Sequence, residues 1–250
     1  MCEECAVRLL LMRRLLVICA VLLAHAAAAQ RHRAVRFPNA QPVTPQHIVL
    51  TASKDNTLFE SSNGGVSNGA GIHLFTGTTN SGSRRRALIA FDLSTIPAGA
   101  KITSVTLTLH ISLSVAGTET LALHGVSADW GEGTSNAGVL RDGNGVSSKT
   151  NDATWIHRFF SNTRWTNAGG DFDSSTDSAA AADAAGTDVV FNATTAMIAR
   201  VQGWVDQPST NFGWIVIGNE NGSRSTKRLS SRESTNTSDR PTLAIDYLPH

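Results

Sequence analysis

The sequence predicts an all-β domain, a two-sheet β-sandwich of jelly-roll type that carries one short helix. About ten short segments have the residue pattern of strands, and one has the pattern of a helix. No strand–helix–strand alternation is present, which argues against a parallel α/β fold. The 21 glycines agree with this prediction, because short strands need many turns between them.

The clearest strands lie in residues 84–113. From Val105 to Leu113 apolar and polar residues alternate, so one face of this strand should meet a core and the other should meet water. An earlier strand runs through Ile89, and a turn with Pro97 and Gly99 separates the two. We interpret the unit as the crossover that takes the chain between strands of the sandwich.

Other strands are predicted on both sides of this unit. The continuous apolar run of residues 212–219 is typical of a buried central strand, and residues 225–233 have the pattern of a polar or edge strand. Residues 169–188 contain few apolar side chains, so we expect a long surface loop there. The remaining predicted strands are residues 47–53, 55–60, 72–77, 121–130 and 241–247.

The helix is predicted over residues 192–208. Its apolar residues recur at helical spacing and form one stripe, which is typical of a helix that covers a core. Asn192 or Thr194 can cap its N-terminus, and Pro208 lies just past its end.

Residues 1–29 have the features of a signal peptide. Arg13 and Arg14 precede the apolar residues 15–24, and three alanines at 27–29 offer a cleavage site. This apolar run is too short to span a bilayer, which needs about 20 residues. We therefore expect a secreted or cell-surface protein without a membrane span. All three cysteines lie in this segment, so the mature chain would have no disulfide.

Residues 30–46 contain three arginines and three prolines, which predicts a linker and leaves residues 47–250 as the domain. The formal net charge of the whole chain is +1, so no general electrostatic case exists for a nucleic-acid or anionic-membrane partner. We expect a monomer.

Several motifs occur in the order found in one known family. They are DNTLFE (55–60), SNGAG (67–71), RRALIAFDLSTIPAGAKITSVTLTL (85–109), ADWGEG (128–133), DATW (152–155), GGDF (169–172), VQGWVDQPSTNFGWIVIGNE (201–220), KRLSSRE (227–233) and RPTLAIDY. This series resembles the DNRLRE family over residues 47–248. The resemblance implies a jelly-roll-like module, non-catalytic and mostly bacterial, in secreted or cell-surface proteins. Some relatives are classed as carbohydrate-binding modules that recognise acidic polysaccharide.

Tryptophans are the first candidates for a polysaccharide site, because aromatic rings stack on the apolar faces of sugars. Trp130, Trp155 and Trp165 fall at a turn or in irregular segments, where they could line a groove together with Glu132. The alternative is that each of them plugs an end of the sandwich. Two further tryptophans, at 204 and 214, fall on the helix stripe and the buried strand and are expected in the core.

A structural Ca²⁺ is expected on analogy with other β-sandwich modules, which bind it at strand ends through oxygen ligands. Asp55, Glu60 and Asp246 are the candidate ligands, since the first and last strands of a jelly roll are often neighbours. Arg232 and Glu233 are expected on opposite faces of a strand, in ion pairs with partners such as Glu60, Asp92 or Arg86.

No catalytic residue is assigned. Glycoside cleavage needs two carboxylates across a cleft; Asp129, Glu132, Glu220 and Glu233 are available, but spacing in the sequence alone does not bring any two of them to that separation. The predicted function is therefore a secreted, non-catalytic module that binds extracellular or envelope polysaccharide. A structural or adhesive surface protein is one alternative, and a polysaccharide hydrolase or lyase is another.

Overall fold

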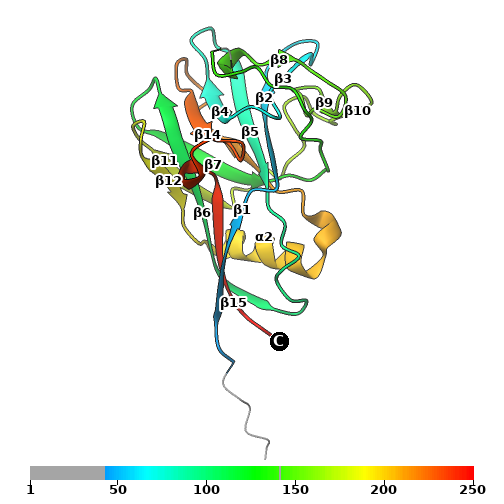
Figure 1. The fold of residues 1–250 in the computed structure, drawn as a ribbon, viewed down its shortest axis with the longest axis vertical. Coiled ribbons are helices and arrows are strands. Elements are labelled where there is room, and N and C mark those ends of the chain that lie inside the picture. Colours follow the sequence, from blue (N-terminus) through cyan, green and yellow to red (C-terminus); the bar gives the residue numbers. More distant parts are fainter. Residues whose placement is uncertain (1–42, 141) are drawn as a thin grey trace, which may run out of the picture. The chain divides into compact units, whose positions relative to one another are not determined.

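A computed structural model describes residues 43–140 and 142–250 (Figure 1). The predicted signal peptide and most of the predicted linker lie outside the described residues. Strand β1 begins at Gln46, the last residue of that linker. None of the helices in the described part of the chain is long and apolar enough to cross a membrane.

The described residues are mostly β-structure with one α-helix, as predicted. The strands are β1 Gln46–Thr51, β2 Lys54–Phe59, β3 Val66–Ser67, β4 His73–Thr78, β5 Arg84–Ala90, β6 Lys101–Ser114, β7 Glu119–Gly125, β8 Val146–Ser147, β9 His157–Phe159, β10 Thr163–Arg164, β11 Ser178–Ala182, β12 Asp188–Phe191, β13 Trp214–Ile217, β14 Lys227–Ser230 and β15 Thr242–Leu248. The helix is α2 Thr195–Asp206, and short 3₁₀ turns are η1 Asp142–Asn144, η2 Pro208–Thr210 and η3 Thr237–Asp239.

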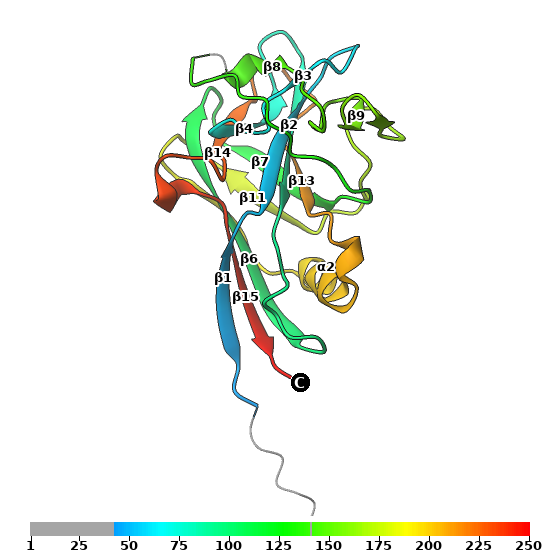
Figure 2. The same ribbon diagram turned by 45° about the vertical axis from the view of Figure 1, so that its right-hand side comes forward.

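Eleven of these strands form one large antiparallel sheet. Its hydrogen-bonded order is β1-β15-β6-β14-β4-β5-β13-β7-β11, with β12 also paired to β6 and β2 also paired to β5. The strands β3 and β8 form one small sheet, and β9 and β10 form another. Both small sheets lie at the end of the molecule away from α2 (Figure 2).

The large sheet curls around its main apolar core. Ile89 and Trp214 come from one half of the strand order, Leu107 and Leu243 come from the other half, and all four belong to one buried cluster. Because hydrogen bonding runs continuously through the curl, the described residues do not show the two separate sheets expected of a sandwich.

Residues 84–113 form a crossover, as predicted, but within one curled sheet. Strand β5 pairs with β2, β4 and β13, whereas β6 pairs with β12, β14 and β15, so the two strands are not partners of each other. Strand β5 ends at Ala90, and Phe91 and Leu93 enter the core from the segment that follows it.

The helix prediction is confirmed, with Thr194 rather than Asn192 as the cap. Thr194 Oγ1 accepts a hydrogen bond from the amide of Met197 at 3.0 Å, which satisfies one of the free amides of the first turn. Met197, Val201 and Trp204 form the buried stripe against the core.

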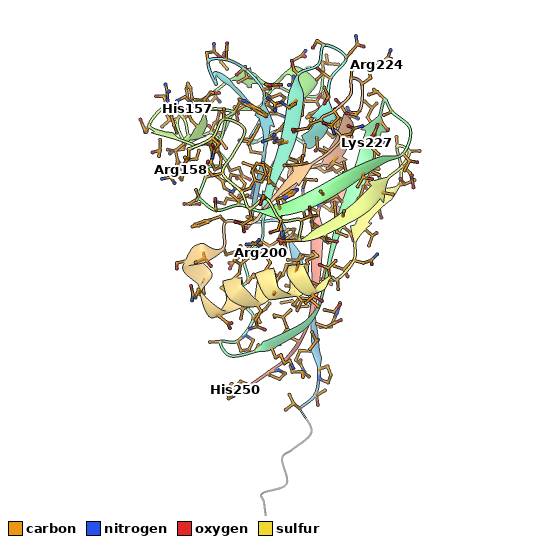
Figure 3. All side chains as sticks on the ribbon, turned by 180° about the vertical axis from the view of Figure 1, so that it is seen from behind. His157, Arg158, Arg200, Arg224, Lys227 and His250 are labelled. Atoms are coloured by element: carbon orange, nitrogen blue, oxygen red, sulfur yellow. The ribbon has the colours of Figure 1, made fainter. Side chains whose placement is uncertain are left out.

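The prediction of a surface loop over residues 169–188 is wrong in its second half. Strand β11, SAAAA, pairs with β7, and Asp177 before it is buried. The Asp177 carboxylate accepts hydrogen bonds from Trp214 Nε1 and from Arg200, which projects from α2 (Figure 3). A run of alanines shows no alternation of apolar and polar residues, so the sequence pattern did not predict a strand here. Its small side chains nevertheless let the backbone pair along β7.

Strand β14 is shorter and more central than predicted. It lies between β6 and β4, not at an edge. Lys227 is fully buried, and its Nζ donates to Ser114 Oγ and to the carbonyl oxygens of Gly117 and Asp183 (Figure 3). These bonds explain how a lysine fits into a central strand, since a buried ammonium needs acceptors on every side.

Candidate functional site

The three tryptophans predicted near a groove are buried. Trp130, Trp155 and Trp165 are 1%, 4% and 5% exposed, respectively. They belong to a second apolar cluster that also contains Leu58 of β2 and Leu88 of β5. The loops that carry them therefore cover one side of these two strands.

Their rings already have partners. The guanidinium carbons of Arg84 and Arg86 each lie 5.0 Å from the centroid of the Trp155 ring, and Lys54 Nζ lies 4.4 Å from that of Trp130. The indole N–H of Trp130 donates to the Phe212 carbonyl, and that of Trp165 donates to the Thr154 carbonyl. All three rings are thus buried over one side of β2 and β5, and none of them offers an open face to a sugar.

Three carboxylates from distant segments meet at the start of β2. Asp55 belongs to β2, Glu132 to the turn after Trp130, and Glu233 to the loop after β14, and their carboxylate oxygens lie within 4.8 Å of one another. We call these three residues the acidic cluster. The Asp55 amide donates to Glu132 Oε1 at 2.8 Å, and Asp55 Oδ2 accepts from the Arg232 amide at 2.7 Å.

The acidic cluster faces two cations. The Arg232 guanidinium lies 3.4 Å from Glu132 Oε1 and also pairs with Glu233, and the charge of Lys54 also acts on Glu132. Burial raises the pKa of Asp55 well above its usual value, and the nearby charges of Glu233 and Glu132 add to this rise. Burial also raises the pKa of Glu132.

A polar cavity of about 470 Å³ opens beside the acidic cluster. Its walls include Thr51 at the end of β1 and Ala52 in the segment that follows, together with Arg232, Glu233 and Arg240. Asp55 itself is 1% exposed, so the cavity reaches the cluster through Glu233 and Arg232.

The predicted metal ligands do not converge. Asp55 lies in the acidic cluster, but Glu60 pairs with Arg84 and Asp246 pairs with His47. The first and last strands are neighbours as expected, because β1 pairs with β15. Asp55 and Glu60, however, belong to β2, whose partner is β5.

Two members of the cluster were predicted elsewhere. Glu132 was predicted in a groove with the tryptophans and lies instead beside Asp55 and Glu233. Glu233 was predicted in a strand with its side chain opposite that of Arg232, but β14 ends at Ser230 and both residues lie in the following turn. There the two side chains pair with each other and not with Glu60, Asp92 or Arg86. One feature of the sequence could have indicated the acidic cluster. All three acids lie in motifs that resemble the DNRLRE family, DNTLFE, ADWGEG and KRLSSRE.

Strands β1 to β7 and the turn that carries Glu132 are the part of the chain that matches a known family. Residues 46–136 match the model of carbohydrate-binding module family 96. The family 96 segment is less than half of the chain, and it contains Asp55 and Glu132 but not Glu233. Carbohydrate-binding modules are typically non-catalytic domains that bind polysaccharide. A comparison with curated proteins found no match to the chain.

Proposed function

We propose that this chain is a secreted, non-catalytic module that binds an extracellular or envelope polysaccharide. The observation that carries this proposal is the match of residues 46–136 to carbohydrate-binding module family 96. We also infer a jelly-roll arrangement in which the two halves of the curled sheet act as two layers. Its support is that both halves contribute side chains to the same core cluster.

The geometry of the acidic cluster favours a module over a hydrolase or lyase. Glycosidases hold two carboxyl groups about 5–10 Å apart on either side of the scissile bond. Here the buried Asp55 is held by the Arg232 amide, and Glu132 and Glu233 both face the Arg232 guanidinium. Asp55 is only 1% exposed, so it cannot act on a sugar from a cleft.

One observation favours the second candidate function, a structural or adhesive surface protein without a small ligand. All five tryptophans are buried, so the stacking surface common to many sugar-binding sites is not provided by any of them. This candidate predicts that sugars leave the melting temperature unchanged.

Binding is tested by affinity electrophoresis of the full chain in gels that contain xylan, mannan, β-glucan, alginate or pectate. We expect retardation in at least one of them, relative to a gel without polysaccharide and to a marker protein that binds no glycan. A matching soluble oligosaccharide at about 100 times its Kd should stabilise the fold by about 2.7 kcal/mol and raise the melting temperature by about 5–10 °C. Unchanged mobility in all five gels would contradict polysaccharide binding and favour the second candidate, a structural or adhesive surface protein.

We further propose that the acidic cluster holds a structural Ca²⁺. Ca²⁺ takes oxygen ligands at about 2.3–2.6 Å, so two ligands of one ion lie no more than about 5 Å apart. The three carboxylates meet this limit, and burial together with the charges of Glu233 and Glu132 raises the pKa of Asp55, as expected of a carboxyl group that lacks a sufficient positive partner. Asp55, Glu132 and Glu233 would hold the ion, which would supply the missing positive charge.

Millimolar Ca²⁺ should raise the melting temperature of the wild-type chain and not that of Asp55→Asn. Asp246→Asn, which changes an exposed carboxylate of β15 that pairs with His47 and lies outside the acidic cluster, should keep the full shift. In chelator, Asp55→Asn should be at least as stable as wild type at neutral pH, because an amide relieves the burial of a charge. Differential scanning fluorimetry measures both effects. An equal Ca²⁺ shift in Asp55→Asn, or none in wild type, contradicts the proposal.

A further inference from the structure

Four asparagines of the chain are followed directly by glycine. They are Asn63, Asn68, Asn144 and Asn221. This dipeptide is chemically reactive, because glycine has no side chain to shield its amide nitrogen, and that nitrogen can attack the amide carbon of the asparagine side chain. The attack needs an asparagine side chain that can turn and a glycine amide that no hydrogen bond holds. The structure separates the four pairs by these two requirements.

In three of the pairs the glycine amide already donates a hydrogen bond. The three bonds are Gly64 to Ser61 Oγ, Gly69 to Ser135 Oγ and Gly145 to the Asp142 carbonyl, each at 3.1 Å. Two of the asparagine side chains are held as well, since Asn63 Oδ1 and Asn68 Oδ1 each accept from a backbone amide. A reaction at any of these pairs must first break the bond of the attacking nitrogen.

The fourth pair, Asn221 and Gly222, lies in the loop between β13 and β14 and is not held in this way. The Gly222 amide donates to no acceptor in residues 43–140 and 142–250. The Asn221 backbone amide donates to Asn219 Oδ1 at 3.0 Å, but its exposed side chain forms no hydrogen bond with these residues. Figure 3 shows Arg224, from the same loop, at the end of the molecule away from α2. Both groups of the pair are therefore free to react in water.

The fold requires glycine in the three held pairs but not at position 222. A Cβ at Gly64, Gly69 or Gly145 would lie 2.7, 1.8 or 2.5 Å, respectively, from its nearest neighbour. At Gly222 a Cβ would meet a single atom, at 4.0 Å, and the backbone there has no positive φ. Alanine can therefore replace Gly222 without a clash, so the reactivity of this pair can be changed while the fold is kept.

We propose that Asn221 is a site of spontaneous deamidation in the folded protein. The Gly222 nitrogen bonds to Asn221 Cγ and loses its proton, and the side-chain amide leaves as ammonia, which closes a succinimide ring. Water then opens the ring at either carbonyl and leaves aspartate or isoaspartate. No oxidant or enzyme takes part. Each event exchanges a neutral amide for a carboxylate, which adds one negative charge to a chain of formal net charge +1.

The test is peptide mapping by mass spectrometry after the folded full-length chain has been kept in mildly alkaline buffer. We expect Asn221 to convert about tenfold faster than the other three asparagines, because their glycine amides must first give up a hydrogen bond. In urea all four should convert at similar rates, since the unfolded chain holds none of them. Gly222→Ala should lose most of the conversion at Asn221, and ion-exchange chromatography should show the loss of the more acidic form.

Gly117→Ala is the matched control. Gly117 is an exposed loop glycine that does not follow an asparagine, and a Cβ there would meet no atom of the described residues within 4 Å. This variant should keep the wild-type rate at Asn221, and the melting temperature of each variant shows that it is folded. Equal conversion of all four asparagines in the folded chain overturns the proposal. So does an unchanged rate in Gly222→Ala, or an intact Asn221 in the folded chain under conditions in which the unfolded chain reacts.

Discussion

Trp214→Ala is expected to lower the free energy of unfolding by about 3–5 kcal/mol. Trp214 is fully buried at the start of β13, and its ring meets that of Trp204 edge-on with centroids 4.5 Å apart. Alanine would leave a cavity in the main core and remove the indole N–H from the buried Asp177 carboxylate. Urea unfolding followed by circular dichroism measures the change.

Trp214→Phe is the control for this prediction. It keeps most of the ring volume and removes the N–H donor, so it should cost clearly less than alanine. Asp177 keeps its bonds to Arg200 in both variants. A loss below about 2 kcal/mol for Trp214→Ala would show that β13 is not closely packed against the helix.

Gly133→Ala should destabilise the fold by about 3 kcal/mol or more, since it combines backbone strain with a clash against a buried charge. Gly133 has φ +79°, and a Cβ there would lie 1.6 Å from Asp152 Oδ1. Asp152 is fully buried and accepts amide hydrogen bonds from Thr134, Ser135 and Lys149. Moving this carboxylate would release the turn that carries Glu132.

Gly138→Ala separates the two causes. Gly138 has a similar φ of +65°, but a Cβ there would meet no atom of the described residues within 4 Å. It should cost only the strain of a positive φ, about 1 kcal/mol. Thermal unfolding of both variants gives the comparison, and equal losses would contradict the role given to Asp152.

Local patterns predicted the elements whose burial follows a regular period. The alternation from Val105 to Leu113 became β6, and the helical stripe became α2 with its predicted cap. The alanine run of β11 was missed because pairing with β7 fixes its backbone while its side chains carry no pattern. The burial of Lys227 was not predicted, and its strand was read as polar. The carbonyl oxygens that accept hydrogen bonds from its ammonium belong to loops far along the chain, which the local pattern does not contain.

The candidate site depended on contacts that no local pattern contains. Asp55 and Glu60 lie on one strand, yet the fold gives Asp55 to the acidic cluster and Glu60 to Arg84. Trp155 and Trp165 follow irregular segments, which suggested exposure. Those segments fold back over β2 and β5 and bury both rings. Which loops cover which strands is decided by the topology of the sheet, and a single sequence does not state it.

The position of β15 has a consequence for how the domain can form. In the strand order β15 lies between β1 and β6, and it is the only link between β1 and the rest of the large sheet in the described chain. His47 and Asp246, opposite each other in this pairing, are 199 positions apart in the sequence. Such long-range pairing is slow to form, because the whole intervening chain must be ordered first. During synthesis, therefore, β1 and one edge of β6 stay open to other strands until residues 242–248 have been made, and the sheet closes only after translation has passed them.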